Sequence, residues 1–235
     1  MSKKMIIHVE EYKLYLKSHN TEMDNFRHKG LRERLIKEVR EKGIHDEDVL
    51  DAMSRVPRHL FMDSSFINFS YTDKAFPISA GQTISQPYTV AFQTQLLEVT
   101  RHQKVLEVGT GSGYQTAVLL ELGARVYTIE RQRQLFLEAQ KTLSPLNYKP
   151  VYFYGDGYEG IPSYAPFDRI LVTAAAPEIP QKLLDQLDIG GILVIPEGGS
   201  AGQRMIRMER KSEKDFQRTE HGHFSFVPLL RGKNI

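Results

Sequence analysis

The feature that most constrains the fold is a series of short β-rich runs that alternate with helical stretches in the second half of the chain. The runs are KVLEV (104–108), RVYTIE (125–130), VYFYG (151–155), DRILVTA (168–174) and ILVIPE (192–197). Such alternation is typical of βαβ units, whose strands pair in parallel within a doubly wound sheet. After residue 202 the runs RMIRMER and HFSFVPLL flank a polar turn, which predicts an antiparallel hairpin at the edge of the sheet. The sequence therefore predicts an α/β, Rossmann-like fold with a mostly parallel sheet.

The first part of the chain predicts helices instead. Between residues 24 and 42 apolar side chains recur every four positions among charged ones, which indicates an amphipathic helix that ends at Gly43. The acidic run 46–48 suits the first turn of a second, shorter helix. Because no Pro/Gly/Ser-rich linker follows, we expect residues 1–75 to be a helical extension packed on a core of residues 76–235, in a single folding unit.

Composition excludes several classes of protein. The 235 residues carry a formal net charge of only +2, with acids and bases scattered along the chain, so we expect no nucleic-acid partner. The absence of cysteine excludes disulfides, thiolate metal sites and cysteine nucleophiles. The apolar stretch 5–9 is too short for a signal peptide or a membrane span. We therefore expect a cytoplasmic protein that needs no membrane, and we favour a monomer.

A glycine-rich turn follows the first β-rich run directly. KVLEV leads into GTGSGY, which opens the next helix, so Gly109, Gly111 and Gly113 let the backbone turn tightly and approach a ligand. A dinucleotide-binding turn requires Gly or Ala at the position that Tyr114 occupies. The spacing of this glycine turn (109–113) therefore favours a nucleoside ligand without phosphates.

Three acidic residues follow three successive β-rich runs. Glu107 is placed to reach the amino group of an amino-acid ligand, and Glu130 to accept hydrogen bonds from ribose hydroxyls. Asp156 is placed to meet an adenine amino group, and Gly157 leaves room for the base. Each acid alone has an ordinary explanation, as a strand residue, a helix N-cap or a turn residue. Their joint position at the carboxyl ends of parallel strands favours one ligand crevice, and the three contacts together match S-adenosylmethionine.

The segment that identifies the chemistry is AFPISAGQTISQPYTVAFQTQLLEV, in which Pro87 marks the first turn of a helix and Ser85 or Gln86 its cap. Together with GTGSGY, GDG, FDRILVTAAAP and FVPLL, this segment resembles the protein-L-isoaspartate O-methyltransferase family, whose characteristic string is close to GQTISQP. The resemblance extends from about Arg55 to Leu229. Residues 1–25 have no counterpart in it, and the phenylalanine before Pro77 replaces the leucine that the family usually carries.

The resemblance implies an activity and a set of residues. The family uses S-adenosyl-L-methionine to methylate the α-carboxylate of L-isoaspartyl residues in damaged proteins and peptides, leaving S-adenosyl-L-homocysteine and an ester that closes to a succinimide. By resemblance, Ser85 is the active-site serine, and the substrate groove is formed by Ser85 with Val227, Pro228 and Leu229, whose backbone binds an extended peptide. The cofactor contacts implied are Thr83, Ile84, Gln86, Glu107, Gly109, Gly111, Gly113, Glu130, Arg131, Asp156 and Gly157.

This reaction suits the residues that are present. A carboxylate with an ordinary pKa of about 4 is already the reactive anion at neutral pH, so the site needs no strong general base. The enzyme's task is to align the reacting atoms and to remove water from the carboxylate. His221 and His223 alternate on a predicted strand and could face one metal ion, but a third ligand is missing nearby. We interpret them as solvated strand residues and expect no metal.

Three alternatives stay open from the residues alone. The first is a methyltransferase acting on RNA or DNA. Enzymes of this class that methylate amines commonly carry Asn or Asp before prolines and an aromatic residue after the fourth strand, where this chain reads TAAAP. Those that methylate carbon 5 of a pyrimidine need a cysteine, which this chain lacks. An NAD-dependent oxidoreductase is compatible with Glu130 and the glycines, whereas Tyr114 argues against it. A binding protein that keeps the cofactor pocket without catalysis is the third.

Overall fold

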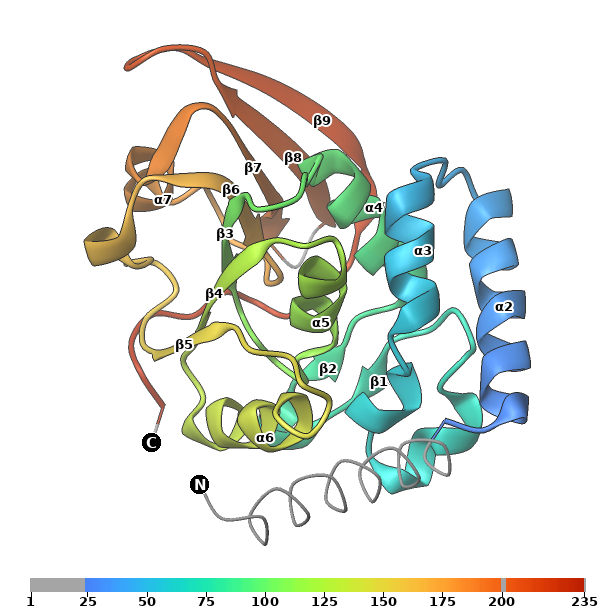
Figure 1. The fold of residues 1–235 in the computed structure, drawn as a ribbon. Helices are drawn as coiled ribbons and strands as arrows, with labels where there is room; N and C mark the ends of the chain where they lie inside the picture. Colours follow the sequence, from blue (N-terminus) through green and yellow to red (C-terminus); the bar gives the residue numbers. More distant parts are fainter. Residues whose placement is uncertain (1–23, 200–201, 235) are drawn as a thin grey trace, which may run out of the picture.

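The structure is a computed structural model that describes residues 24–199 and 202–234 (Figure 1). In these residues a central sheet of seven strands has the order β5-β4-β3-β6-β7-β8-β9. The strands are β3 (Lys104–Val108), β4 (Arg125–Glu130), β5 (Val151–Tyr154), β6 (Phe167–Val172), β7 (Leu187–Gly199), β8 (Gly202–Arg210) and β9 (Phe216–Phe224). Strands β3 to β7 pair in parallel, whereas β8 pairs antiparallel with both β7 and β9. The predicted α/β fold with a mostly parallel sheet is confirmed.

The strand order creates a switch point between β3 and β6. From β3 the chain moves outward to β4 and β5, and it then returns to place β6 on the other side of β3. In doubly wound sheets the crevice at the carboxyl ends of the strands beside such a reversal is where ligands bind. The glycine turn leaves β3 at this point.

The predicted hairpin is present, but its second arm differs from the prediction. The sequence placed that arm at 223–230, whereas β9 ends at Phe224 and the following residues run across the carboxyl edge of the sheet. Ala175, just after β6, donates its N–H to Val227 O at 2.9 Å and accepts from Leu229 N at 2.7 Å. Val227 and Leu229 therefore bond to the segment after β6 instead of continuing the β8–β9 ladder.

Helices of the described residues cover both faces of the sheet. The α-helices are α2 (Phe26–Glu41), α3 (Glu47–Arg55), α4 (Pro87–Leu97), α5 (Tyr114–Glu121), α6 (Arg133–Leu143) and α7 (Gln181–Asp185). Short 3₁₀ turns are η1 (Arg58–Phe61), η2 (Ser64–Phe69), η3 (Ser79–Gly81) and η4 (Pro162–Tyr164), and a small antiparallel pair is β1 (Phe76–Pro77) with β2 (Thr83–Ile84). As predicted, α2 ends just before Gly43, whose φ is +102°, and Asp46 caps α3 by accepting from Val49 N.

Alternating side chains on the strands define the two layers. On β3, Val105 packs with Leu97 of α4 and Leu119 of α5, while Leu106 packs on the other face with Leu183 of α7. This alternation follows from the two-residue period of a strand. Figure 1 shows α3 lying between α5 and the outermost helix, α2. The first helices thus form a third layer over the α4–α5 face.

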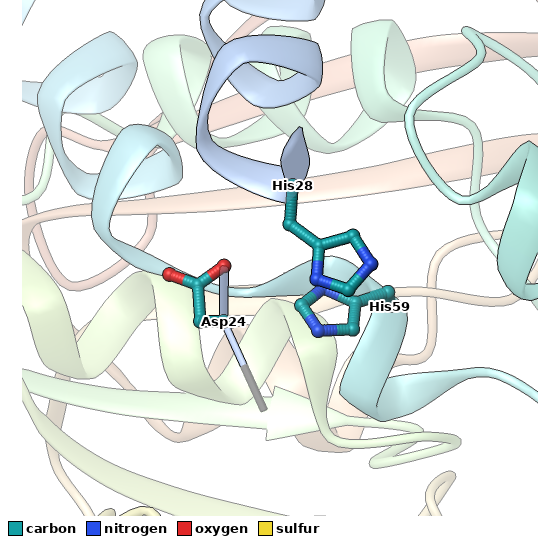
Figure 2. Close-up of side chains that lie close together, drawn as sticks. All are labelled: Asp24, His28 and His59. Carbon is teal, nitrogen blue, oxygen red and sulfur yellow. The ribbon is translucent and has the colours of Figure 1, made fainter. Parts of the chain in front are cut away.

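A polar network fixes the start of α2 to η1 and to the turn after η2, and Figure 2 shows three of its residues, Asp24, His28 and His59. His28 and His59 stack with their ring centroids 3.8 Å apart, and Asp24 lies beside them. Arg32 donates to both oxygens of Asp24, at 3.0 and 2.9 Å, and its Nη1 also lies 2.8 Å from Tyr71 Oη. That hydroxyl is 2.7 Å from Nδ1 of His59. Because the guanidinium occupies the carboxylate, we interpret the cluster as a structural anchor.

Two predictions concern the amino-terminal residues and a membrane span. Residues 1–23, with the start of the predicted helical extension and the predicted lack of a signal peptide, lie outside the described residues. Within 24–199 and 202–234, none of the helices combines the length and the apolar character that a membrane span requires.

Candidate active site

A hollow lies at the carboxyl ends of β3 and β4, beside the switch point of the sheet. Its walls are the glycine turn, the end of β4, the residues just after β6, and the segment 227–230. We name this hollow the edge cavity. The predicted site residues that line it are Thr83, Gly109, Gly111, Glu130, Arg131, Gly157, Val227, Pro228 and Leu229.

The glycine turn is shaped by its neighbour after β6. Gly109 has a φ of +97°, and a Cβ there would collide with the hydroxyl oxygen of Thr173. That hydroxyl lies 2.7 Å from Gly109 O and 3.0 Å from Val108 O. Gly111, with a φ of +53°, has only Ile78 Cδ1 near the position of a Cβ, at 3.8 Å. The turn is thus packed tightly at Gly109, whereas a Cβ at Gly111 would meet Ile78 only at an ordinary contact distance.

Glu130 is placed by the same turn. Its Oε2 accepts from Gly111 N at 3.0 Å and its Oε1 from Gln132 N at 2.8 Å, so the carboxylate joins the end of β4 to the glycine turn. The N-cap position of α6 is Gln132, which removes the ordinary N-cap explanation for Glu130. A buried carboxylate on the wall of a cavity can accept hydrogen bonds from ligand hydroxyls.

Glu107 faces the α5 layer and lies outside the lining of the edge cavity. Its side chain is 0% exposed, and Oε2 accepts from Thr116 Oγ1 at 2.5 Å and from Thr128 Oγ1 at 2.7 Å. Its Oε1 has no hydrogen-bond partner among the described residues. Burial raises the pKa of Glu107 to about 8, although the two hydroxyls lower it. Its contact with a ligand amino group stays a prediction.

Asp156 also lies outside the lining of the edge cavity. Its Oδ1 accepts from Tyr158 N at 2.9 Å, and its Oδ2 accepts from Gly232 N at 2.6 Å. Gly157 does line the cavity, and a Cβ there would lie 2.5 Å from Val108 Cγ1. The GDG turn thus approaches the cavity through Gly157, while the adenine contact of Asp156 stays a prediction.

A second, more open hollow lies next to the edge cavity, and we name it the serine groove. Its lining is Ala75, Thr83, Ser85, Gln86, Tyr88, Thr89, Thr173, His223, Phe224, Ser225, Phe226 and Val227. Three of these residues, Thr83, Thr173 and Val227, line the edge cavity as well. The two hollows therefore share one boundary, with Ser85 on the groove side of it.

The cap of α4 agrees with the prediction in position, because Gln86 is the N-cap residue. Its side chain makes no capping hydrogen bond, however. Asp73 supplies that bond from outside the helix, because its Oδ1 accepts from Tyr88 N at 2.7 Å. The Ser85 side chain lines the serine groove.

The remaining predicted residues lie in different surroundings. Ile84 is buried in the core, and Gly113 packs against Leu143 of α6. His221 is half-buried, 3.0 Å from Thr219 Oγ1, and burial lowers its pKa. A register shift opposite Arg204 and Met205 leaves Gly222 as an extra residue, so His221 and His223 do not follow a simple alternation. His223 lines the serine groove.

Sequence reasoning missed three residues around these hollows. Thr173 directly follows β6, so the rule that located the acids at the ends of strands could have found it. Asp73 gave no local signal, since its contacts Gln86 and Tyr88 come 13 and 15 residues later. His223 was recognised only as a strand residue.

The residues around the edge cavity fit S-adenosylmethionine. Apolar side chains such as Val108, Ile129 and Leu135 offer surfaces for a nucleoside, while Glu130 offers a carboxylate. A mostly apolar cavity with a few convergent polar groups is typical of such sites. The position beside the switch point is that of nucleotide sites in this class of sheet.

Comparison with known proteins agrees with this site. A sequence profile of the protein-L-isoaspartate(D-aspartate) O-methyltransferase family matches residues 30–234. The chain belongs to this family. Protein-L-isoaspartate O-methyltransferases of Christiangramia forsetii and Flavobacterium johnsoniae are 61% and 58% identical to it over 212 residues, which is 90% of this chain and 99% of each relative. The family that the TISQP segment (83–87) indicated is confirmed.

Two solved structures named for protein-L-isoaspartate O-methyltransferase share the fold. One has a TM-score of 0.77 at 25% identity and covers 84% of this chain, which spans 65% of that one. The other, from Plasmodium falciparum and in complex with S-adenosyl-L-homocysteine, has a TM-score of 0.74 at 26% identity, covering 86% of this chain and 98% of that one. Membership of the protein-L-isoaspartate O-methyltransferase family disfavours the nucleic-acid methyltransferase and the NAD-dependent oxidoreductase as alternatives.

Proposed function

We propose that the protein transfers a methyl group from S-adenosylmethionine to the α-carboxylate of L-isoaspartyl residues in damaged proteins and peptides. Membership of the protein-L-isoaspartate O-methyltransferase family makes it an S-adenosylmethionine-dependent methyltransferase. The observation that carries the proposal is the boundary of Thr83, Thr173 and Val227, which belongs both to the edge cavity and to the serine groove. A donor bound on one side and a peptide bound on the other meet there.

The edge cavity is the proposed cofactor site. Glu130 would hold the ribose hydroxyls, and the backbone of Gly109 and Gly111 would approach the methionine part of the cofactor. Further proposed cofactor residues are Thr83, Ile84, Gln86, Glu107, Gly113, Arg131, Asp156 and Gly157. When bound, the cofactor supplies a methyl group on a positively charged sulfur.

The serine groove is the proposed peptide site. Ser85 would donate a hydrogen bond to one oxygen of the substrate carboxylate and leave the other oxygen free to attack. Val227 would form a wall of the groove, although its carbonyl already accepts from Ala175 N. Pro228 and Leu229, also proposed for the peptide site, line the edge cavity instead of the groove. The groove needs no general base because the substrate carboxylate is ionised at neutral pH.

The methyl ester is the proposed product of the enzyme itself. Attack of the adjacent backbone nitrogen on the ester carbonyl would close a succinimide, breaking the ester C–O bond and releasing methanol, and hydrolysis of this ring would return part of the material to ordinary aspartyl residues. We propose that these later steps need no residue of the chain, so that the protein initiates repair and does not complete it.

Further properties belong to the same proposal. We propose a cytoplasmic monomer that acts without a metal and without a nucleic-acid partner, and whose residues 24–75 fold together with residues 76–235. The last point is supported by one hydrophobic cluster that contains Leu35 and Val39 of α2 together with Ala117 and Val118 of α5.

The test is transfer of labelled methyl groups to a peptide that contains isoaspartate, beside an otherwise identical peptide with ordinary aspartate. We expect labelling of the first peptide only. Equal labelling of both peptides, or of neither, would rule out the proposed specificity, and labelling of RNA would favour a nucleic-acid methyltransferase. Calorimetric titration with S-adenosyl-L-homocysteine and with NAD separates the two cofactor classes, and we expect binding of the first alone.

A further inference from the structure

A buried carboxylate lies directly beneath the TISQP segment. The side chain of Asp73 is 2% exposed, and its two oxygens accept three hydrogen bonds. Oδ1 accepts from Tyr88 N at 2.7 Å, while Oδ2 accepts from Gln86 Nε2 at 2.9 Å and from Lys42 Nζ at 2.6 Å. Two of the three donors belong to residues on either side of Pro87, immediately after Ser85.

We propose that Asp73 is a positioning residue that fixes the hydroxyl of Ser85 toward the serine groove. The inference rests on the proposed function, in which Ser85 orients the substrate carboxylate. Asp73 touches neither hollow, since it is absent from the described lining of both. It acts through the residues that flank Pro87, because it accepts hydrogen bonds from the Gln86 side chain and from the backbone N–H of Tyr88.

The first turn of α4 explains why an outside acceptor is needed. The first four N–H groups of a helix lack partners within it, and Pro87 at the first position has no N–H to offer. The side chain at the N-cap position, Gln86, makes no capping hydrogen bond and donates to Asp73 instead. A carboxylate at Tyr88 N therefore satisfies the helix start and also complements the positive end of the helix dipole.

The three donors also explain why the group must be a carboxylate. An ionised Asp is an acceptor at both oxygens, whereas Asn presents an NH₂ group in place of one of them. The amide of Asp73→Asn can take two orientations. In one, its NH₂ would face the N–H of Tyr88. In the other, it would face the Gln86 amide and the Lys42 ammonium. One of the donors would then lose its acceptor, and a buried donor without a partner is costly.

The same carboxylate connects the TISQP segment to the first helices. Lys42, at the end of α2, bonds both to Asp73 and to Glu38, each at 2.6 Å, and these hydrogen bonds raise the pKa of Lys42. The fully buried Arg58 of η1 adds a second positive charge, which attracts Asp73. The position of Ser85 thus depends on residues from the helical part of the chain.

The first experiment compares Asp73→Asn with a matched control, Asp63→Asn. Asp63 also caps a helix through its side chain, at Ser65 N, but it is exposed and belongs to η2. For Asp73→Asn we expect kcat on the isoaspartyl peptide to fall about tenfold or more, because a displacement of about 1 Å can cost about a hundredfold in rate. The Kd for S-adenosyl-L-homocysteine should change by a smaller factor than kcat, since the hydrogen bonds of Asp73 do not reach Glu130 or the glycine turn, and Asp63→Asn should keep kcat within about twofold.

The second experiment tests whether Asp73 acts through Ser85. We expect Asp73→Asn to lower kcat by less than about twofold when Ser85 is already replaced by alanine, because residues that act as one unit are not additive. Full additivity would overturn the proposal, as would an unchanged kcat in Asp73→Asn alone. If Asp73→Asn does not fold, Lys42→Met replaces it, and we expect a two- to threefold lower kcat; an unchanged kcat there contradicts the proposal.

Amide hydrogen exchange separates this inference from the proposed function. We expect faster exchange in residues 83–88 of Asp73→Asn and unchanged exchange in the glycine turn. Unchanged exchange in 83–88 would overturn the positioning role even if the wild-type protein methylates the peptide. Faster exchange in 83–88 could also be found together with a wild-type protein that labels no isoaspartyl peptide. In that case Asp73 would still hold this segment in place, and the proposed substrate would be rejected.

Discussion

The edge cavity and the serine groove share a boundary but are assembled from different kinds of chain segment. The central polar group of the edge cavity comes from one βαβ unit, in which the glycine turn and Glu130 lie about twenty residues apart and bond to each other directly, while residues such as 173 and 227–230 complete the walls. The serine groove combines residues near 85, residue 173 and residues 223–227. The comparison teaches that a local motif places the central groups of one hollow, whereas the groups of the other are brought together only by distant parts of the chain.

The two hollows also differ in how their key groups are held. In the edge cavity, Thr173 and Glu130 hold the glycine turn from positions that themselves line the cavity. In the serine groove, the segment that carries Ser85 is held by Asp73, which lies outside the lining. Substitutions should therefore act on cofactor binding in the first hollow and on turnover in the second.

The largest effect is expected for Gly109→Ala. An alanine at a φ of +97° is strained, and its Cβ would collide with the Thr173 hydroxyl, so the glycine turn must move. We expect the Kd for S-adenosyl-L-homocysteine to rise by about a hundredfold or more, as calorimetry would measure. Gly190→Ala is the matched control, because Gly190 also has a positive φ, +79°, but open space around it. Normal cofactor binding by Gly109→Ala would show that the turn is not part of the site.

The next effect tests the groove. In Ser85→Ala we expect kcat on the isoaspartyl peptide to fall about tenfold, with the Kd for S-adenosyl-L-homocysteine within about twofold, because the hydroxyl positions the substrate and forms no covalent bond. Steady-state kinetics and calorimetry measure the two quantities. Ser64→Ala, at an exposed position of η2, should leave both unchanged. If Ser85→Ala weakens cofactor binding instead, the separation of the two hollows is wrong.

Thr173 lies on the boundary of the two hollows, so its substitution should change both cofactor binding and peptide turnover. Thr173→Val keeps the shape of the side chain but removes the hydroxyl that bonds Gly109 O and Val108 O. One lost hydrogen bond of about 1 kcal/mol corresponds to about a fivefold change, and we expect it both in cofactor Kd and in peptide kcat/KM. Thr142→Val, which removes a hydroxyl bonded to Glu138 O on α6, is the control. A change in only one of the two quantities would show that Thr173 does not belong to both hollows.

The smallest effect concerns Glu107 behind the glycine turn. Its folded-state pKa of about 8 exceeds the ordinary value of 4.5, so its contribution to stability is present at low pH and is lost as the pH rises through about 8. Between pH 7 and pH 8 this loss amounts to about 1 kcal/mol in the free energy of unfolding. We expect Glu107→Gln to remove it in denaturant titrations at the two pH values. Glu213→Gln, at an exposed turn, should keep the wild-type difference, and a Glu107→Gln variant that does so too would contradict the raised pKa.

The sequence predicted most of the fold because local patterns decide it. The β-rich runs at 104–108 and 125–130 coincide with β3 and β4, and Gly43 directly follows the C-cap residue of α2. The second arm of the C-terminal hairpin was misplaced because residues 225–230 are apolar enough for a strand, yet Val227 and Leu229 bond to Ala175. Only the tertiary structure selects between those partners.

The site was predictable to the extent that strand ends define it. The glycine turn and Glu130 were located at the edge cavity because the carboxyl ends of parallel strands meet at one edge. The environment of Glu107 was not predictable, since the direction of its side chain depends on the alternation along β3 and on two threonines of other elements. The capping hydrogen bond of α4 was not predicted because its acceptor, Asp73, lies 15 residues before the donor, Tyr88.

The segment 227–230 joins the fate of the two hollows. It comes after every parallel strand, the glycine turn and the TISQP segment in the sequence, and two hydrogen bonds to Ala175 hold it, through Val227 O and Leu229 N. Its residues wall the edge cavity, and Val227 also walls the serine groove. A change that releases this segment from Ala175 would therefore open the cofactor site and the peptide site together.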